Sequence, residues 1–290
     1  MRSIKKLLLY IRPYWIPAVL SLLALVALVF LDLAIPRLVQ HIIDEGIEKQ
    51  NQSVVVQTGL IMLGITALST LISIANNVLS VRVGENVARD IREALVLKIQ
   101  QFSFGNLDAL KTGQLMVRLS SDTTAFQRLT QVSLRIGTRA PMLMIGSLIL
   151  MLTTSFSLAM TMLPLLIITS ILIIFFIIRT EPLFRKVQQR LDKLNTVLQE
   201  NVAGARLIKA FVRVDFEGQR FESANESFAK QSIQVMQFNT SMTPALTLCV
   251  NIGMVVVAWF GGLDAIRGDM SVGQVVAFNN YLLTTLSLEP

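Results

Sequence analysis

The residue types that usually carry out chemistry are scarce in this sequence of 290 residues. His41 is the only histidine and Cys249 the only cysteine. A single imidazole excludes any site that needs two, and a single thiol excludes both an internal disulfide framework and a cysteine-based metal cluster. No phosphate-binding loop of the form G-x-x-x-x-G-K-[ST] occurs either. The sequence therefore predicts no metal site, no bound cofactor and no nucleotide-hydrolysing site within this chain.

The remaining candidates are polar side chains that stand inside long apolar stretches. In a membrane protein such residues are rare, and they usually mark the path of a substrate or an ion. The candidates for lining a path are Asn76, Asn77, Asn239, Thr243, Asn251 and Asn279. The alternative stays open that these side chains hydrogen-bond between helices, a contact that contributes about 0.6 kcal/mol on average.

The elements that would position these residues follow from composition and charge spacing. The chain is 53% hydrophobic and 16% charged, against about 45–50% and about 25% in soluble domains, so a disordered chain is excluded and an ordinary soluble enzyme is disfavoured. Residues without charge fill the ranges 13–31, 50–81, 140–178, 231–263 and 270–288. A membrane-spanning helix needs about 20 such residues, and the third range suffices for two. We therefore predict an all-α membrane protein with six spans near 14–38, 54–82, 136–154, 157–179, 238–262 and 271–290.

The basic residues orient these spans. Of 26 Lys and Arg residues, 23 fall in the segments 1–12, 82–139 and 179–230. Because Lys and Arg accumulate on the cytoplasmic side of membrane proteins, these segments and the N-terminus are predicted to be cytoplasmic. The net charge of +7 is then a signal of topology, and nucleic acid is not an expected partner.

Two predicted cytoplasmic segments, about 83–135 and 180–237, are too long and too regular to be simple loops. Leu191, Leu194, Leu198 and Val202 make an apolar stripe with helical periodicity. We expect the membrane helices to continue into the cytoplasm as hairpins. The hairpin tips fall near 104–108 and 211–218, where phenylalanines stand among charged residues.

Several groups of residues form motifs in a fixed order along the chain. They are Arg12-Pro13-Tyr14-Trp15, then Thr112, Gly113, Leu115, Arg118 and Asp122 in the pattern T-G-x-L-x-x-R-L-x-x-D, then Glu200, Gly204 and Arg206, and finally Gly273, Ala277, Phe278 and Tyr281. In this order they resemble the transmembrane domain of ABC exporters, in particular bacterial multidrug-type half-transporters, over essentially the whole chain.

The resemblance implies an interfacial elbow helix at 1–12 and an exporter transmembrane domain at 13–290, in the bacterial cell membrane. Two half-transporters, identical or different, would pair and exchange helices around a path for an amphipathic substrate such as a drug-like compound or lipid. Membrane lipid would surround the pair. The tips would be coupling helices that dock on nucleotide-binding domains holding ATP and Mg²⁺. The coupling residues would be Phe104, Gly105, Asn106, Leu107, Asp108, Phe211, Arg213, Asp215, Phe216 and Glu217.

The resemblance also gives a role to Asp44. With Glu45 and Glu48 it forms the acidic cluster of the outer side, and by family position it would lie at the extracellular gate. A solvated loop carboxylate is the alternative.

The sequence departs from the family by having no nucleotide-binding domain, so we expect a fragment or the product of a split gene. Two other functions stay open. A secondary transporter or channel would need a charged residue deep in a span, and Asp32, the deepest one, is expected near the outer end of the first span. A non-transporting membrane scaffold would use the tips only for docking.

Overall fold

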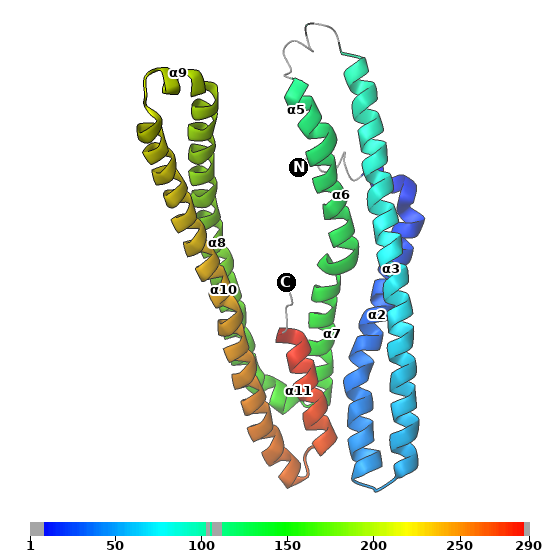
Figure 1. The fold of residues 1–290 in the computed structure, drawn as a ribbon. Helices are drawn as coiled ribbons and strands as arrows, with labels where there is room; N and C mark the ends of the chain where they lie inside the picture. The colour runs from blue at the N-terminus through cyan, green and yellow to red at the C-terminus, as the bar shows by residue number, and fades with distance from the viewer. Residues whose placement is uncertain (1–8, 103–104, 106–111, 287–290) are drawn as a thin grey trace. The chain divides into compact units, whose positions relative to one another are not determined.

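The computed structural model describes residues 9–102, 105 and 112–286, and throughout this part of the chain every regular element is a helix (Figure 1). By internal contacts the chain divides into two units, residues 1–156 with 258–290 and residues 157–257. The helices of unit 1 are η1 (Leu9–Tyr14), α2 (Trp15–His41), η2 (Ile42–Ile47), α3 (Gln52–Gln100), α5 (Thr112–Val117), η3 (Arg118–Asp122), α6 (Thr123–Val132), η4 (Ser133–Gly137), α7 (Arg139–Thr154) and α11 (Val272–Leu286). Unit 2 is built from α8 (Phe156–Ala203), α9 (Ala205–Ala210) and α10 (Val214–Arg267), and the last turns of α10 belong to unit 1.

Within unit 1, α2 and α3 form an antiparallel pair joined by η2 and a short turn (Figure 1). The α3 helix begins at Asn51, whose side chain caps it by accepting a hydrogen bond from the Val54 amide at 3.4 Å. Its 49 residues make about 74 Å of helix, more than twice the thickness of a bilayer core. One helix of this length can therefore both span a membrane and project well beyond it.

The core of unit 1 has two parts. Near the start of α2, Ala18 packs with Val83, Val87 and Ile91 of α3, and Phe126 of α6 covers this cluster. In the second part of the core, α11 packs on α2 and α7. It inserts side chains that are completely buried: Ala277, Phe278, Tyr281 and Leu282. Three of these belong to the last motif of the sequence, so that motif forms packing core.

Unit 2 is a long helical hairpin in which α8 and α10 run antiparallel, with α9 at its tip (Figure 1). Leu194, Val197 and Ala224 form its buried seam. The predicted stripe was only partly correct, because Leu198 is 39% and Val202 77% exposed. Beyond Leu194 the seam continues at Val197, three residues on, where the prediction placed Leu198, four residues on.

The all-α membrane fold predicted from the sequence is confirmed. Five helical stretches of the described chain are long and apolar enough to cross a membrane, namely Tyr10–Ile47, Gln52–Gln100, Leu115–Thr154, Phe156–Ala203 and Val214–Arg267. The predicted sixth span corresponds to α11, of which 15 residues are described and which falls short of the length needed for such an assignment.

Candidate functional site

The tip of unit 2 is a short helix followed by a tight reversal. The α8 helix ends before Gly204, whose amide donates to the Glu200 carbonyl at 2.8 Å, and α9 follows. The chain then turns at Val212, whose backbone adopts the left-handed conformation with φ +50°. A hydrogen bond from the Arg213 amide to the Ile208 carbonyl, 2.9 Å long, closes the turn. A β-branched residue at positive φ is strained, so the surrounding hydrogen bonds must fix this turn.

The helix at the tip therefore lies earlier than the sequence indicated. The prediction centred the tip on 211–217, but α9 occupies Ala205–Ala210 and only Phe211, Val212 and Arg213 form the turn. Asp215, Phe216 and Glu217 belong to the first turn of α10. Arg206 of the family motif lies on α9 and is exposed.

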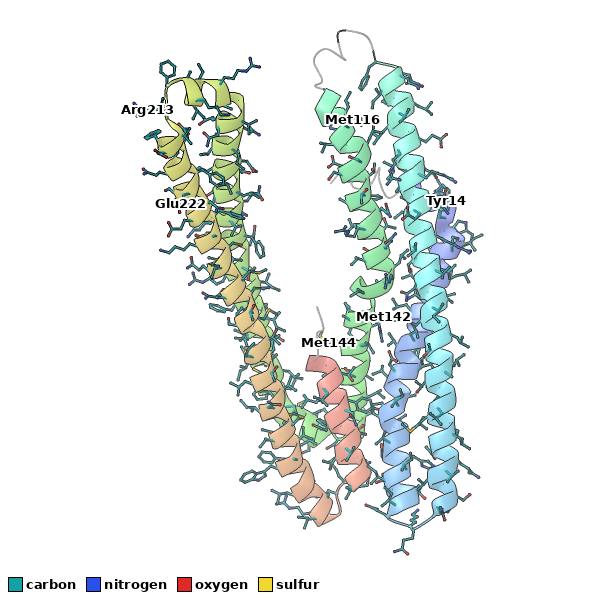
Figure 2. The ribbon with its side chains drawn as sticks, in the orientation of Figure 1. Tyr14, Met116, Met142, Met144, Arg213 and Glu222 are labelled. Atoms are coloured by element: carbon teal, nitrogen blue, oxygen red, sulfur yellow. The ribbon has the colours of Figure 1, made fainter. Side chains whose placement is uncertain are left out.

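An apolar surface with basic neighbours covers this tip, and we call it the tip patch: Leu207, Phe211, Val212, Val214 and Phe216, each more than half exposed. The Arg213 guanidinium lies 5.8 Å from the centroid of the Phe216 ring. Figure 2 shows Arg213 at the outermost part of the hairpin. Large apolar side chains gathered at an exposed end are a mark of a surface that contacts a partner.

A polar brace stands directly behind the tip patch. Arg220 of α10 donates to Glu200 of α8 at 2.5 Å and to Glu217 at 3.4 Å. The two carboxylates raise the pKa of the Arg220 guanidinium, Glu200 having the larger effect. Exposed ion pairs contribute little to stability, so the brace orients α8 and α10 behind the tip patch while the buried seam of Leu194, Val197 and Ala224 holds the two helices together.

A cavity of about 350 Å³ opens beside the brace, lined by Asn201 of α8, Ile208 of α9 and Phe221 of α10 among others. The Asn201 side-chain oxygen is buried and has no hydrogen-bond partner within the described residues. An unpaired buried acceptor is costly, so this oxygen lowers the stability of the tip.

Most of the first predicted tip lies outside the described residues. This applies to Phe104, Asn106, Leu107 and Asp108, whereas Gly105 is described and exposed. The motif that follows lies in α5 and η3: Thr112, Gly113, Leu115, Arg118 and Asp122. Arg118 and Asp122 are exposed and form no ion pair within the described part of the chain. Their predicted coupling role stays a prediction.

At the other end of unit 1, Asp44 caps α11. Its carboxylate accepts the Ser271 hydroxyl at 2.7 Å and the Gly273 amide at 2.9 Å. Ser271 and Gln274 add a reciprocal capping box, with the Gln274 amide donating to the Ser271 hydroxyl and the Ser271 amide to the Gln274 side chain. A carboxylate at a helix N-terminus also interacts favourably with the helix dipole. Asp44 thus has polar partners on α11, while its assignment to an extracellular gate stays a prediction.

Gly273 is required for this contact. A Cβ atom at this position would overlap the Asp44 carboxylate and lie 2.6 Å from the Gln40 carbonyl oxygen. Only glycine lets the start of α11 approach η2 this closely.

The polar residues predicted to line a path divide into different environments. Asn76 is buried between α2 and α3, where its side-chain oxygen accepts from Ser21 at 2.5 Å and from Ser80 at 3.2 Å. This is the helix-to-helix contact that the sequence left as an alternative. Asn77 is half-buried, and Asn279 has a buried side-chain oxygen with no partner within the described residues. Exposed positions on α10 hold Asn239, Thr243 and Asn251.

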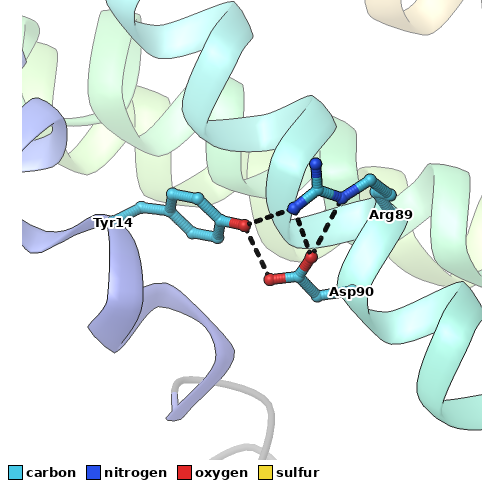
Figure 3. A network of polar contacts seen from close by, with 3 residues as sticks. All are labelled: Tyr14, Arg89 and Asp90. Carbon is cyan, nitrogen blue, oxygen red and sulfur yellow. Dashed lines mark hydrogen bonds and ion pairs between the residues drawn. The ribbon is translucent and has the colours of Figure 1, made fainter.

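Residues 1–8 of the predicted elbow at 1–12 lie outside the described residues, and η1, at the end of that segment, is joined to α3 through Tyr14 (Figure 3). The Tyr14 hydroxyl donates to the Asp90 carboxylate at 2.7 Å and accepts from the Arg89 guanidinium at 3.0 Å. Arg89 also bonds to Asp90 at 3.0 Å. This network joins the start of the first span to α3 and so fixes the entry of the chain into α2.

Sequence reasoning missed one ion pair. Arg139 at the start of α7 donates to Asp32 of α2 at 2.8 Å. The pair gives Asp32, the deepest charge that the sequence placed in a span, a partner on another helix. The sequence feature that could have indicated this ion pair is the position of the two residues, each of which borders a long charge-free range: 13–31 for Asp32 and 140–178 for Arg139.

These features define a multi-pass integral membrane protein whose long helices end in an exposed, braced tip. Residues 18–288 match the family model of the ABC transporter transmembrane region, so the chain belongs to that family. It is the membrane domain of an ABC transporter. Membership in this family argues against an independent carrier or channel.

Relatives with full-length sequences support the same assignment. The chain is 32% identical over 277 residues to the uncharacterized ABC transporter ATP-binding protein YfiB of Bacillus subtilis (strain 168), covering 96% of this chain and 48% of the relative. It is 30% identical over 278 residues to an uncharacterized ABC transporter ATP-binding protein of Mycobacterium tuberculosis (strain H37Rv), with 96% and 48% coverage. The chain thus spans about half the length of these relatives.

Proposed function

We propose that the chain forms the translocation path of an ATP-driven exporter and transmits the work of ATPase domains through the tip patch. The observation that carries this proposal is the combination of exposed Phe211 and Phe216 with basic residues on a hairpin whose end is held by the Arg220 brace. Rigid positioning is what a force-transmitting contact needs, because a loosely held tip would move without moving its helices.

The partners of this function are a nucleotide-binding domain, which would hold ATP and Mg²⁺, and a second half-transporter. The names of the relatives include the words ATP-binding protein. The half of each relative that this chain does not cover is long enough for such a domain. The chain would lie in the bacterial cell membrane with its N-terminus in the cytoplasm, in agreement with the distribution of Lys and Arg. An amphipathic substrate, drug-like or lipid, fits a path that combines apolar surface with scattered amides.

Two features support a docking role for the tip in particular. The tip patch is large and apolar where a soluble surface would be polar. The cavity beside it, lined by Asn201, Ile208 and Phe221 among others, offers a hollow into which a side chain of a partner could pack. A membrane scaffold that does not transport would also dock through this patch, so the test must measure coupling as well as binding.

The test replaces Phe211 by Ala in the full-length protein, or in this chain co-expressed with its nucleotide-binding domain. Phe184→Ala is the control, because Phe184 is also an exposed phenylalanine, 51% against 72% for Phe211, and lies on α8 twenty residues before Gly204. We expect Phe211→Ala to lower substrate-stimulated ATP hydrolysis in vesicles about tenfold or more, since buried interface aromatics often contribute 2 kcal/mol or more. Phe184→Ala should leave the rate within about twofold. Equal rates for both variants would remove the mechanism from this proposal.

A further inference from the structure

A hollow of about 560 Å³ lies between α8 and α10 within unit 2. Every side chain that lines it belongs to this hairpin, so its shape does not depend on where unit 1 lies. Val197 of α8 and Ala224 of α10 line it and are buried, and they form its floor. Ser223 and Ser227 line its α10 side. Because these side chains of α10 are small, they leave space between the two helices.

Three cations surround this hollow: Arg190 and Lys193 of α8 and Arg220 of α10. The charge of Arg220 is already balanced by Glu200 and Glu217 in the brace. Arg190 and Lys193 form no ion pair within the part of the chain that the structure describes. Two exposed positive charges one turn apart on α8 are thus available to a ligand.

The carboxylates nearby do not reach into the hollow. Glu222 and Glu226 each stand two residues from Ala224, and two residues turn an α-helix by about 200°, so both lie on the face of α10 opposite the floor. On α8, Asp192 accepts a hydrogen bond from Gln188 at 3.0 Å and is not a lining residue. Within the described residues of the hairpin, the two available cations therefore lack a counter-ion.

The hollow lies outside the membrane. Exposed apolar side chains continue along α8 as far as Ile177 and Ile178, and charged residues begin at Arg179. Arg190 follows Arg179 by 11 residues, about 17 Å of helix, whereas the head-group layer is about 5–8 Å deep on each side of a bilayer. Even a helix tilt of about 40° leaves about 13 Å between these two levels. A ligand of the hollow is therefore dissolved in water and is not a membrane lipid.

The groups around the hollow match a phosphate group. A guanidinium presents parallel N–H donors to two oxygens, and an ammonium supplies three further donors. A phosphate monoester has three terminal oxygens and a charge of about −1.5 to −2 at pH 7, which balances Arg190 and Lys193. The volume lies within the range of small-molecule sites, about 300–1,000 Å³, so the hollow holds more than a phosphate alone. The hydroxyls of Ser223 and Ser227 suit a polar organic part.

We propose that this hollow binds a small, water-soluble phosphorylated compound. Arg190 and Lys193 bind the phosphate oxygens, and Ser223 and Ser227 contact the rest of the molecule. The ligand then touches both helices and joins α8 to α10 next to the Arg220 brace. This site goes beyond the proposed function, and neither depends on the other.

The test measures binding of ribose 5-phosphate to the chain in phosphatidylcholine nanodiscs by isothermal titration calorimetry, in a buffer free of phosphate. Ribose lacks the phosphate group, and gluconate carries a carboxylate on a similar polyol. A peptide of six glutamates represents an acidic protein segment. The chain has no phosphate-binding loop of the form G-x-x-x-x-G-K-[ST] that would add a second site. Protection of the buried Cys249 from a thiol-reactive dye reports whether each variant is folded.

We expect ribose 5-phosphate to bind at least tenfold more tightly than gluconate, and ribose to give no measurable heat. Arg190→Gln and Lys193→Gln should each weaken binding of ribose 5-phosphate about fivefold or more, because each removes a charge-assisted contact. Ser223→Leu should weaken it about tenfold although every cation remains, because the larger side chain fills the hollow. Arg128→Gln, the same charge change at an exposed position of α6, should bind as the unchanged chain does.

Three results would overturn the proposal. Equal affinity for gluconate and ribose 5-phosphate would remove the preference for phosphate. Tighter binding of the glutamate peptide, in competition with ribose 5-phosphate, would make the hollow a docking site for an acidic protein segment. Full affinity in a folded Ser223→Leu chain, or an equal loss in Arg128→Gln and Arg190→Gln, would show attraction to the overall positive charge of the chain instead of a site.

Discussion

Replacing Asp44 tests how α11 is held against η2. The carboxylate accepts two hydrogen bonds, from the Ser271 hydroxyl and the Gly273 amide. Hydrogen bonds to a charged group contribute about 1.5–3 kcal/mol each, and the lower value applies to this partly exposed site. Asp44→Ala should thus cost about 3 kcal/mol, whereas Asp44→Asn, which keeps a neutral acceptor, should cost about 1 kcal/mol.

Thermal unfolding in a non-ionic detergent measures this cost through the reaction of Cys249 with a thiol-reactive dye, because Cys249 is buried in the folded chain. With a shift of about 2 °C per kcal/mol for a chain of this size, Asp44→Ala should lower the Tm by about 6 °C and Asp44→Asn by about 2 °C. Hydrogen exchange should accelerate at the first amides of α11 in both variants. Asp269→Asn, an exposed carboxylate two residues before Ser271, is the control and should change neither quantity.

The double variant Asp44→Ala with Ser271→Ala separates a direct contact from an indirect effect. Since both single changes remove the same hydrogen bond, the double variant should cost less than the sum of the two. Full additivity, or an Asp44→Ala chain as stable as Asp269→Asn, would refute the capping interpretation.

Two further contacts can be tested with the same assay. Tyr14→Phe removes the hydroxyl that bonds to Asp90 and should lower stability by about 1 kcal/mol. Tyr10→Phe, which loses no hydrogen bond to any residue that the structure describes, should leave stability unchanged. Gly146→Val would place a Cβ against the Leu33 side chain and should cost about 2 kcal/mol by overpacking. Adding Leu33→Ala should recover part of that loss, and no recovery would show that the cost arises elsewhere.

The fold could be predicted from the sequence because a bilayer imposes strong rules. A backbone in hydrocarbon must satisfy its own hydrogen bonds, so each long charge-free range had to be helical. The predicted spans near 54–82 and 238–262 accordingly lie within α3 and α10. The prediction that these helices continue past the apolar ranges was also correct, because little proline or glycine interrupts them.

The tip of unit 2 was located only approximately. The sequence signals were phenylalanines and charges near Phe211, but the helix ends at Gly204 and α9 lies before those residues. A helix of six residues is too short to show a clear periodicity, and its ends depend on hydrogen bonds such as that from the Arg213 amide to the Ile208 carbonyl. Such bonds join residues that a local pattern does not connect.

The sequence by itself determined that this chain spans a membrane repeatedly and that one cysteine and one histidine exclude an internal disulfide, a cysteine-based metal cluster and a site of two imidazoles. It also predicted which side of the membrane the basic segments occupy. Those properties depend on the type and spacing of residues within one helix. The tertiary structure decided which distant side chains meet: Asp44 with Gly273, Asn76 with Ser21, and Asp32 with Arg139. These contacts join residues 55 to 229 positions apart, and their existence depends on how the helices pack and rotate about their axes.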